Sequence, residues 1–318
     1  MGRHLSRISS ANLSRREFLA AGAGATAGTL LSGCLRAAGD GPSERLITKA
    51  IPQSGQRLPV IGLGTDAFRV ADRDEIRAEI RRMSELRGAV IDTAAAYGDS
   101  EALIGDALES LGLRERMFLA TKLVASGGPS GAVGAESFER SLERLKTQHI
   151  DLLQVHNLNG VATLIPLMQE WKKAKRIRYI GVTTSRVSQH AELLTVMRSY
   201  PLDFIQVDYS LGNRDAAAAV LPLALERKLA VLVNLPFGRS SLFAQAAGRK
   251  LPAWAADIDV KSWAQYFLKY VISHPAVTCA IPGSTKVSHL EDNQGAGRGR
   301  LPDAAMRRKM EEDWDHGA

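Results

Sequence analysis

Short apolar runs recur along the chain from residue 46, between segments in which Leu, Ile and Met repeat at helical spacing against charged faces. Successive runs are separated by about the length of one strand, one helix and two loops, which predicts a repeated β–α unit. The eight predicted strands cover residues 60–64, 89–93, 117–122, 151–156, 177–183, 203–209, 230–235 and 278–283.

Eight parallel strands with crossover helices favour a closed (β/α)8 TIM barrel, an α/β fold with a single barrel domain. A doubly wound open sheet is the competing arrangement for the same alternation. Residues 46–59, with Ser54-Gly55 between two apolar pieces, predict an N-terminal hairpin that plugs the barrel floor. Residues 303–316 predict an amphipathic C-terminal helix, for which covering the barrel surface is favoured over binding a partner. The other predicted helices cover residues 74–86, 100–111, 136–145, 162–175 and 263–272.

The composition is that of a folded protein, because 45% of the 318 residues are hydrophobic and 24% are charged. Lys and Arg number 41 against 34 Asp and Glu, but the excess is not gathered into a basic stripe with interleaved aromatic residues, which argues against nucleic-acid binding. The histidines show no ligand spacing with cysteines or carboxylates, so we expect no metal site. Cys34 and Cys279 are the two cysteines, and we expect no disulfide framework.

The first 34 residues resemble a twin-arginine (Tat) export signal. Ser-Arg-Arg-Glu-Phe-Leu-Ala at 14–20 leads into an uncharged Gly/Ala-rich run. That run is shorter than the roughly 20 apolar residues of a membrane span. Leu-Ser-Gly-Cys at 31–34 resembles a lipobox, so Cys34 is a candidate for lipidation, with an ordinary cleaved signal peptide as the alternative. We expect residues 35–45 to be a tether, and we expect the protein in the periplasm or cell envelope, with retention in the cytoplasm as the alternative.

Four ionisable side chains lie at or just after the ends of three consecutive predicted strands. They are Asp92, Tyr97, Lys122 and His156. Because barrel active sites lie at the C-terminal strand ends, we expect these groups to meet, although each alone has a structural explanation such as a strand-end cap. Asp92 can supply the counter-charge that a buried Lys122 needs, and the ammonium should lower the pKa of the Tyr97 phenol, making it a usable proton donor. His156 can hydrogen-bond a substrate oxygen.

The chain resembles the aldo-keto reductases over about residues 46–296, followed by a helical tail at 297–318. The resemblance rests on Leu-Pro-Val-Ile-Gly-Leu-Gly-Thr at 58–65, Asp-Thr-Ala-Ala-Ala-Tyr-Gly-Asp-Ser-Glu-Ala-Leu-Ile-Gly at 92–105, Ser-Leu-Glu-Arg-Leu at 141–145 before Ile-Asp-Leu at 150–152, and Ile-Pro-Gly-Ser at 281–284. It implies an NAD(P)H-dependent oxidoreductase on a TIM barrel. Asp92, Tyr97, Lys122 and His156 match the family's catalytic tetrad, in which the tyrosine protonates the carbonyl oxygen during hydride transfer.

The resemblance also implies a nicotinamide cofactor, with NADP(H) favoured over NAD(H). Gln206 matches the glutamine that bonds the nicotinamide amide, whereas Asn234 stands where many members have a stacking tyrosine, a contact that Phe237 can replace. Lys286 is the clearest positive charge for a 2′-phosphate, because His289 stands where the family often has an arginine. For the stretch that begins at Gly283, plain helix capping by Ser284 or Thr285 is the alternative. The implied cofactor residues are Gly64, Thr65, Asp92, Thr183, Thr184, Gln206, Asn234, Phe237, Arg239, Gly283, Ser284, Thr285, Lys286, His289, Asp292 and Asn293.

These observations favour an exported reductase that acts on a small-molecule aldehyde or ketone, or on the alcohol in reverse, and that reaches its compartment through the Tat export machinery. Contact with a membrane is expected only through a lipid anchor at Cys34. The competing function is a nucleotide-binding sensor or accessory protein with the same barrel and no significant turnover. The complete tetrad argues against the sensor, whereas the substitution at Asn234 argues for it.

Overall fold

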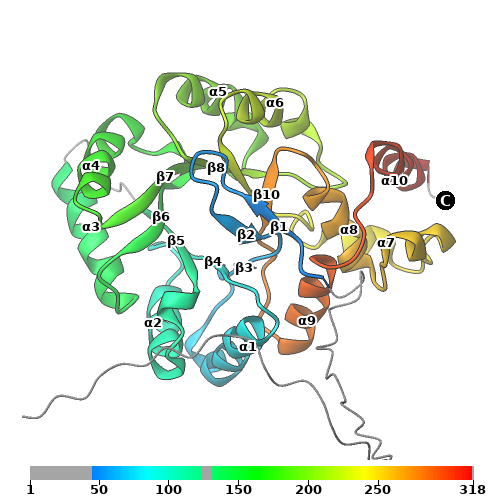
Figure 1. Ribbon diagram of the computed structural model, residues 1–318, viewed down its shortest axis with the longest axis horizontal. Coiled ribbons are helices and arrows are strands. Elements are labelled where there is room, and N and C mark those ends of the chain that lie inside the picture. The colour runs from blue at the N-terminus through cyan, green and yellow to red at the C-terminus, as the bar shows by residue number, and fades with distance from the viewer. Residues whose placement is uncertain (1–44, 124–130, 317–318) are drawn as a thin grey trace, which may run out of the picture. The chain divides into compact units, whose positions relative to one another are not determined.

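The computed structural model describes residues 45–123 and 131–316, so the predicted export signal, the lipobox at Cys34 and nearly all of the tether lie outside the described residues. Eight parallel strands form one sheet in the order β10-β9-β8-β7-β6-β5-β4-β3. Two further parallel bridges, Ile61 to Ala280 and Gly64 to Gly283, bring the first strand beside the last. The predicted TIM barrel is therefore confirmed, and the open sheet is excluded (Figure 1).

The elements follow the predicted alternation, with ends displaced by a few residues. The barrel strands are β3 (Leu63–Gly64), β4 (Val90–Asp92), β5 (Phe118–Leu123), β6 (Ile150–Val155), β7 (Ile177–Thr183), β8 (Phe204–Asp208), β9 (Ala230–Asn234) and β10 (Val277–Ala280). The α-helices are α1 (Arg73–Glu85), α2 (Ser100–Leu111), α3 (Gly131–Arg144), α4 (Val161–Lys173), α5 (His190–Ser199), α6 (Val220–Glu226), α7 (Ser241–Ala246), α8 (Trp263–Ile272), α9 (Val287–Ala296) and α10 (Ala304–His316). The short 3-10 helices are η1 (Val70–Asp72), η2 (Arg114–Arg116), η3 (His156–Leu158), η4 (Val187–Gln189), η5 (Asp215–Ala217) and η6 (Ala253–Ile258).

Barrel closure depends on a glycine at the end of β3. The amide of Gly64 donates to the carbonyl oxygen of Pro282 at 2.9 Å. A Cβ atom at position 64 would lie 2.7 Å from the main-chain oxygen of Ile281, which is closer than real Cβ contacts allow. Glycine therefore lets the backbones of the first and last strand regions approach, which sets the end of β3 beside the segment that leads into α9.

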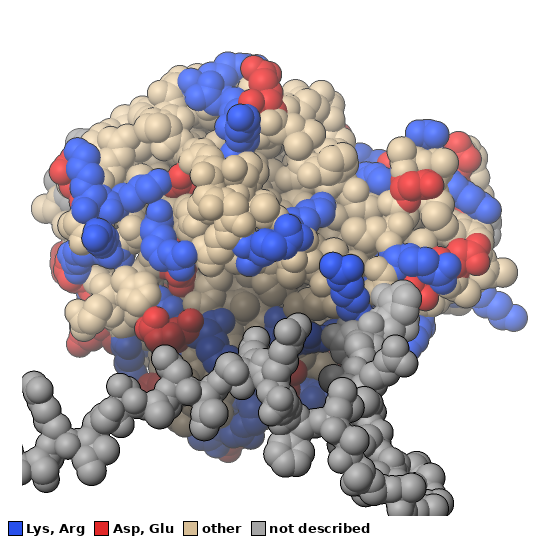
Figure 2. All heavy atoms as spheres, in the orientation of Figure 1, with Lys and Arg blue, Asp and Glu red and all other residues tan. Residues whose placement is uncertain are grey.

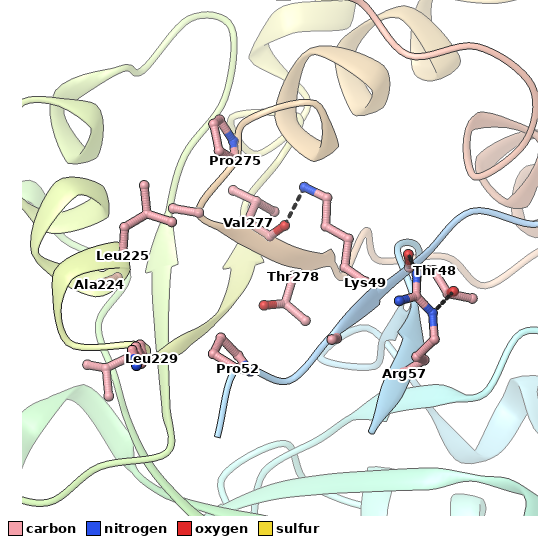
Figure 3. Close-up of a pocket in the computed structure, with 13 residues that line it drawn as sticks. Thr48, Lys49, Pro52, Arg57, Ala224, Leu225, Leu229, Pro275, Val277 and Thr278 are labelled. Carbon is pink, nitrogen blue, oxygen red and sulfur yellow. Dashed lines mark hydrogen bonds between the residues drawn. The ribbon is translucent and has the colours of Figure 1, made fainter. Parts of the chain in front are cut away.

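An N-terminal hairpin closes the barrel floor, as predicted. Its strands, β1 (Thr48–Ala50) and β2 (Arg57–Pro59), pair antiparallel. Ile51 and Leu58 belong to the buried apolar cluster inside the barrel, together with Phe118 at the start of β5. The Lys49 ammonium donates to three main-chain oxygens around the end of α8 and the start of β10, one of them the oxygen of Val277 at 2.6 Å. Figure 3 shows this contact beside a cavity of about 400 Å³ between the hairpin and β10.

Helices surround the barrel, and the predicted C-terminal helix covers part of them. In α10 the side chains of Met310 and Trp314 are buried, and Trp314 packs edge-on against Phe267 of α8. On the face that carries the hairpin, Lys and Arg lie in separate groups interspersed with Asp and Glu (Figure 2). No described helix is long and apolar enough to cross a membrane.

Candidate active site

The C-terminal ends of β4 and β5 bring together two oppositely charged side chains. The two strands are adjacent and parallel, with Asp92 opposite Ala120. Val90 and Ala120 belong to the apolar cluster inside the barrel, so Asp92 and Lys122, each two residues further along its strand, also face the interior. The Lys122 Nζ donates to Asp92 Oδ2 at 2.5 Å and to the main-chain oxygen of Thr93 at 2.8 Å. Only 1% of the lysine side chain and 3% of the aspartate side chain are exposed. The structure therefore forms the predicted pair, fully removed from solvent.

The charge state of Lys122 is set by its neighbours. Burial alone would lower the pKa of the Lys122 ammonium, because a low-dielectric environment disfavours the charged form. The Asp92 carboxylate and the Tyr97 phenol outweigh burial, so the pKa of Lys122 lies above its ordinary value. Lys122 is therefore an ammonium at neutral pH.

Tyr97 lies above this pair, in the loop between β4 and α2. The Lys122 Nζ lies 4.8 Å from the centroid of the Tyr97 ring. The Tyr97 ring meets the His156 imidazole edge-on, with centroids 5.9 Å apart and an interplanar angle of 82°. Both rings are half-buried at the barrel mouth. The four predicted side chains therefore meet at one end of the barrel, opposite the hairpin.

The expected lowering of the Tyr97 pKa is wrong for the protein without bound ligands. Burial raises the pKa of the phenol, and the positive charge of Lys122 only partly offsets that effect. The negative charge of Asp92 adds to the upward shift. A partly buried phenolate loses hydration that one ammonium, itself paired with a carboxylate, does not fully replace. The phenol therefore keeps its proton throughout the neutral range.

His156 follows β6 and opens the 3-10 helix η3, in which Asn157 adopts a left-handed backbone conformation with φ of 51°. Burial, and secondly the nearby Lys122 ammonium, lower the pKa of the imidazole to about 4. The imidazole is therefore neutral at pH 7 and offers one N–H donor and one acceptor to the space beside Tyr97.

Two glutamines complete the surroundings of the Asp92 carboxylate. Gln206 on β8, a predicted cofactor residue, donates from Nε2 to Asp92 Oδ2 at 3.4 Å. Gln154 on β6 donates from Nε2 to Asp92 Oδ1 at 3.3 Å. It was not among the predicted site residues. A polar residue at an interior-facing position of the apolar strand run Leu-Leu-Gln-Val was the available signal for it. Thr65, another predicted cofactor residue, donates from Oγ1 to the main-chain oxygen of Asp92 at 3.0 Å.

Amide oxygens suited to a bound group are present at the same end of the barrel. The Oε1 atom of Gln206 and the Oδ1 atom of Asn234 are buried and have no hydrogen-bond partner among the described residues. The hydroxyl of Thr183 accepts from the amide of Asn157 at 3.1 Å and keeps its own proton available. In contrast, Thr184 is fully buried and its hydroxyl donates to the Gln189 side chain at 2.7 Å. The Thr184 hydroxyl therefore uses its proton within the protein, whereas the other three side chains each keep an acceptor or a donor for a bound group.

The loop after β9 carries two further predicted cofactor residues. Phe237 is half-buried and packs on Phe243 of α7, with ring centroids 4.9 Å apart. Arg239 is exposed and has a left-handed backbone, with φ of 53°. The structure therefore sets an aromatic ring and a solvent-facing guanidinium on the segment that follows Asn234.

The segment from Gly283 to Asn293 forms the start of α9 and the loop before it. Lys286 and His289 are exposed, whereas Ser284 is buried and its hydroxyl donates to the main-chain oxygen of Lys286 at 3.1 Å. Thr285 is half-buried between them. The Ser284 hydroxyl therefore forms a local turn contact and does not cap α9, whose N-cap residue is Lys286 without a side-chain cap hydrogen bond.

Asp292 lies toward α8 rather than free toward a ligand. Its Oδ1 and Oδ2 atoms accept from the Ser262 hydroxyl at 2.9 Å and 2.7 Å, and Oδ1 also accepts from Gln265 Nε2 at 2.8 Å. Asn293 is buried within α9. In this structure Asp292 therefore joins α9 to the N-terminus of α8, a contact that the sequence spacing did not indicate.

Two carboxyl groups of α1 also adjoin the start of α9. Glu75 accepts from the first α9 amide, that of Val287, at 3.0 Å. Glu79 is fully buried, its two carboxyl oxygens have no hydrogen-bond partner among the described residues, and burial raises the pKa of this carboxyl to about 7. No group of three or more His, Cys, Asp or Glu among residues 45–123 and 131–316 is placed to hold a metal ion.

We predict that His156 contributes to acid destabilisation. The folded-state pKa of about 4 lies below the ordinary value of 6.5, so between these values the unfolded chain binds a proton that the folded protein does not. Acidification therefore favours unfolding. The drop in unfolding free energy between about pH 7 and about pH 4.5, measured by urea denaturation, should be smaller in His156→Gln than in the wild type. An identical pH dependence in both proteins would contradict the burial of a neutral imidazole.

Comparison with known proteins places the barrel in a family. Residues 60–311 match the model of the aldo/keto reductase family. The chain is 31% identical over 258 residues to the methylglyoxal reductase YeaE of Escherichia coli (strain K12), covering 77% of this chain and 88% of that protein. It is 29% identical over 298 residues to the aldo-keto reductase str7 of Strobilurus tenacellus, covering 80% and 87% of the two chains.

A solved structure agrees with the fold. The aldo/keto reductase from Klebsiella pneumoniae in complex with NADP and acetate superposes with a TM-score of 0.72 at 24% sequence identity, covering 83% of this chain and 94% of that chain. The family match spans the barrel from its first strand region into the C-terminal helix. The chain belongs to the aldo/keto reductase family.

Proposed function

We propose that the protein is an NADP(H)-dependent oxidoreductase that reduces a small aldehyde or ketone to an alcohol, or catalyses the reverse reaction. The observation that carries the proposal is the convergence of a protonated phenol, a buried ammonium and a neutral imidazole at the barrel mouth. Tyr97 and His156 face each other at 5.9 Å, with the Lys122–Asp92 pair beneath the phenol. Family membership supports the same reaction class.

Each of the four side chains has a separate role in the proposed carbonyl reduction. The neutral His156 imidazole donates an N–H to the carbonyl oxygen and so fixes its position against Tyr97. As negative charge develops on that oxygen, the Tyr97 phenol transfers its proton to it and becomes a phenolate. Lys122 stabilises the phenolate, and Asp92 keeps the ammonium charged and oriented. A bound, reduced nicotinamide would supply the hydride for the carbonyl carbon.

The residues at the barrel mouth fit a nicotinamide nucleotide. The unpartnered oxygens of Gln206 and Asn234 are acceptors for a carboxamide N–H, and the Thr183 hydroxyl is a donor for its oxygen. Phe237 offers an aromatic face from the neighbouring loop. Gly64 and Gly283, side by side at the barrel seam, leave backbone accessible next to them.

The far end of the nucleotide would lie along the start of α9. The first turn of a helix favours an anion, and the exposed Lys286 and His289 lie beside it. Thr285 and Arg239 supply further donors. The Glu75 carboxylate accepts the hydrogen bond of the Val287 amide in this structure, so this bond would have to break before a 2′-phosphate could bind the same amide. We therefore assign the preference for NADP(H) chiefly to Lys286.

The substrate class that we propose is a small-molecule carbonyl compound or the corresponding alcohol. The name of the Escherichia coli relative, methylglyoxal reductase, indicates such a substrate for that protein. The half-buried Tyr97 and His156 side chains can offer two hydrogen bonds to one oxygen, which suits a carbonyl group.

We predict that Tyr97→Phe abolishes reduction, lowering turnover by at least about a thousandfold, because the phenol is the proton donor. Nucleotide affinity should stay within about twofold of the wild type, since the phenol transfers a proton to substrate rather than holding the cofactor. The measurements are absorbance at 340 nm with a panel of small aldehydes, and NADPH binding followed by tryptophan fluorescence. Unchanged turnover in Tyr97→Phe would refute the proposed donor. Binding without turnover in the wild type would instead favour a nucleotide-binding sensor.

The cofactor preference is tested at Lys286. Lys286→Met should weaken NADPH binding about tenfold and leave NADH binding nearly unchanged, because only NADPH carries the 2′-phosphate. Lys261→Met is a control with the same change of charge, because Lys261 is an exposed lysine in the connection between η6 and α8. Equal loss of affinity for both nucleotides in Lys286→Met would contradict the assignment.

The cellular location that we propose is the periplasm or the cell envelope, reached through the Tat machinery with the cofactor already bound. The consecutive arginines Arg15 and Arg16 support this location, and Cys34 is the residue that would carry a lipid anchor. In fractionated cells, the wild-type protein should be recovered from the envelope and the Arg15→Lys/Arg16→Lys variant from the cytoplasm. Recovery of both proteins from the cytoplasm would overturn the proposed location.

A further inference from the structure

A buried glutamine outside the four predicted catalytic positions holds the aspartate at the base of the site. Gln154 lies on β6, two residues before His156, and its side chain is fully buried. Along the strands it stands opposite Lys122 on β5 and Gly181 on β7. Its Nε2 reaches past β5 to the Asp92 carboxylate on β4, at 3.3 Å from Oδ1. A single side chain therefore links β6 to β4 across the intervening strand.

The two oxygens of Asp92 have separate donors. Oδ2 accepts from Lys122 at 2.5 Å and from Gln206 at 3.4 Å. Oδ1 accepts from Gln154, its one side-chain donor among the described residues. Removing the Gln154 amide would leave Oδ1 buried without a partner and free the carboxylate to rotate about its Cβ–Cγ bond.

The protein accommodates this glutamine at a cost. The Gln154 Oε1 atom is buried and has no hydrogen-bond partner among residues 45–123 and 131–316, so a leucine at this position would avoid an unsatisfied polar atom. A Cβ atom on Gly181 would lie 3.1 Å from Gln154 Cγ, so the glycine on β7 leaves the space that the side chain occupies. Gln154 stands opposite Lys122, and its contact with Asp92 explains why an amide is buried at this level of the barrel.

We propose that Gln154 is a positioning residue for hydride transfer, which holds Asp92 ionised and oriented so that Lys122 remains a charged partner of the Tyr97 phenol. This inference rests on the proposed function for its effect on turnover, but the contact itself does not. Burial raises the pKa of Asp92, and hydrogen bonds from Lys122, Gln206 and Gln154 oppose that rise. Loss of the amide should therefore raise the pKa of Asp92 further.

Two substitutions at this position have opposite expected pH dependences. In Gln154→Leu, single-turnover hydride transfer should fall about tenfold, with the deficit greatest at low pH, because the carboxyl of Asp92 protonates more easily. In Gln154→Glu, the protonated glutamic acid still donates to Oδ1, whereas the ionised form repels it. The deficit in Gln154→Glu should therefore grow as the pH rises. The other titratable groups facing Asp92 are unchanged in both variants: Lys122 on β5, Tyr97 in the β4–α2 loop, His156 after β6 and Cys279 on β10.

A matched control separates positioning from packing. Leu152→Ala truncates a fully buried side chain on the same strand, in the apolar cluster inside the barrel, and should lower stability without changing the shape of the pH profile. NADPH affinity, followed by tryptophan fluorescence, should stay within about twofold of the wild type in both Gln154 variants. If the rate of hydride transfer changed with pH in the same way in Gln154→Leu and Gln154→Glu, or in the same way as in the wild type, the proposal would be overturned.

A second measurement does not depend on turnover. Carbon-13 NMR of the Asp92 carboxyl, assigned with Asp92→Asn in protein without nucleotide, should give a titration midpoint about one pH unit higher in Gln154→Leu than in the wild type. An unchanged midpoint would overturn the proposal. If the wild type transferred no hydride, the proposed function would fall, and the carboxyl titration would still decide whether Gln154 controls Asp92.

Discussion

A carboxylate and an ammonium buried together inside the barrel are the constraint around which the site is built. Asp92 and Lys122 lie 2.5 Å apart with almost no exposed surface. Removing either partner would leave an uncompensated charge in a low-dielectric interior, which costs roughly 3–5 kcal/mol. The other groups are set by this pair. Lys122 partly offsets the rise in the pKa of Tyr97, and together with burial it keeps His156 neutral.

Most of the fold could be predicted because strand and helix periodicities are local properties of the sequence. The eight apolar runs and the helical segments between them all correspond to observed elements, and the Ser54-Gly55 turn marked the hairpin at the floor. Closure was harder to predict, because it depends on contacts between the two ends of the barrel. The approach of Gly64 to Ile281 joins residues far apart in the chain, and no local pattern distinguishes it from an open sheet edge.

The site was predictable where it depends on strand order and unpredictable where it depends on burial. Strand ends indicated that Asp92 and Lys122 would meet, and they do. The predicted direction of the Tyr97 pKa shift was wrong, because the sequence shows that an ammonium is near but does not show how much hydration the buried phenol loses. The contacts of Gln154 with Asp92 and of Asp292 with α8 were missed for a related reason, since each spans elements whose relative placement only the folded chain defines.

Asp92 and Lys122 are proposed to act on the Tyr97 phenol as one unit. A double-mutant cycle of Asp92→Asn and Lys122→Met, with the single-turnover rate of NADPH oxidation by a small aldehyde as the readout, tests it most directly. If the pair acts as one unit, each single variant should lose nearly as much rate as the double variant. Losses that multiply independently in the double variant would contradict it.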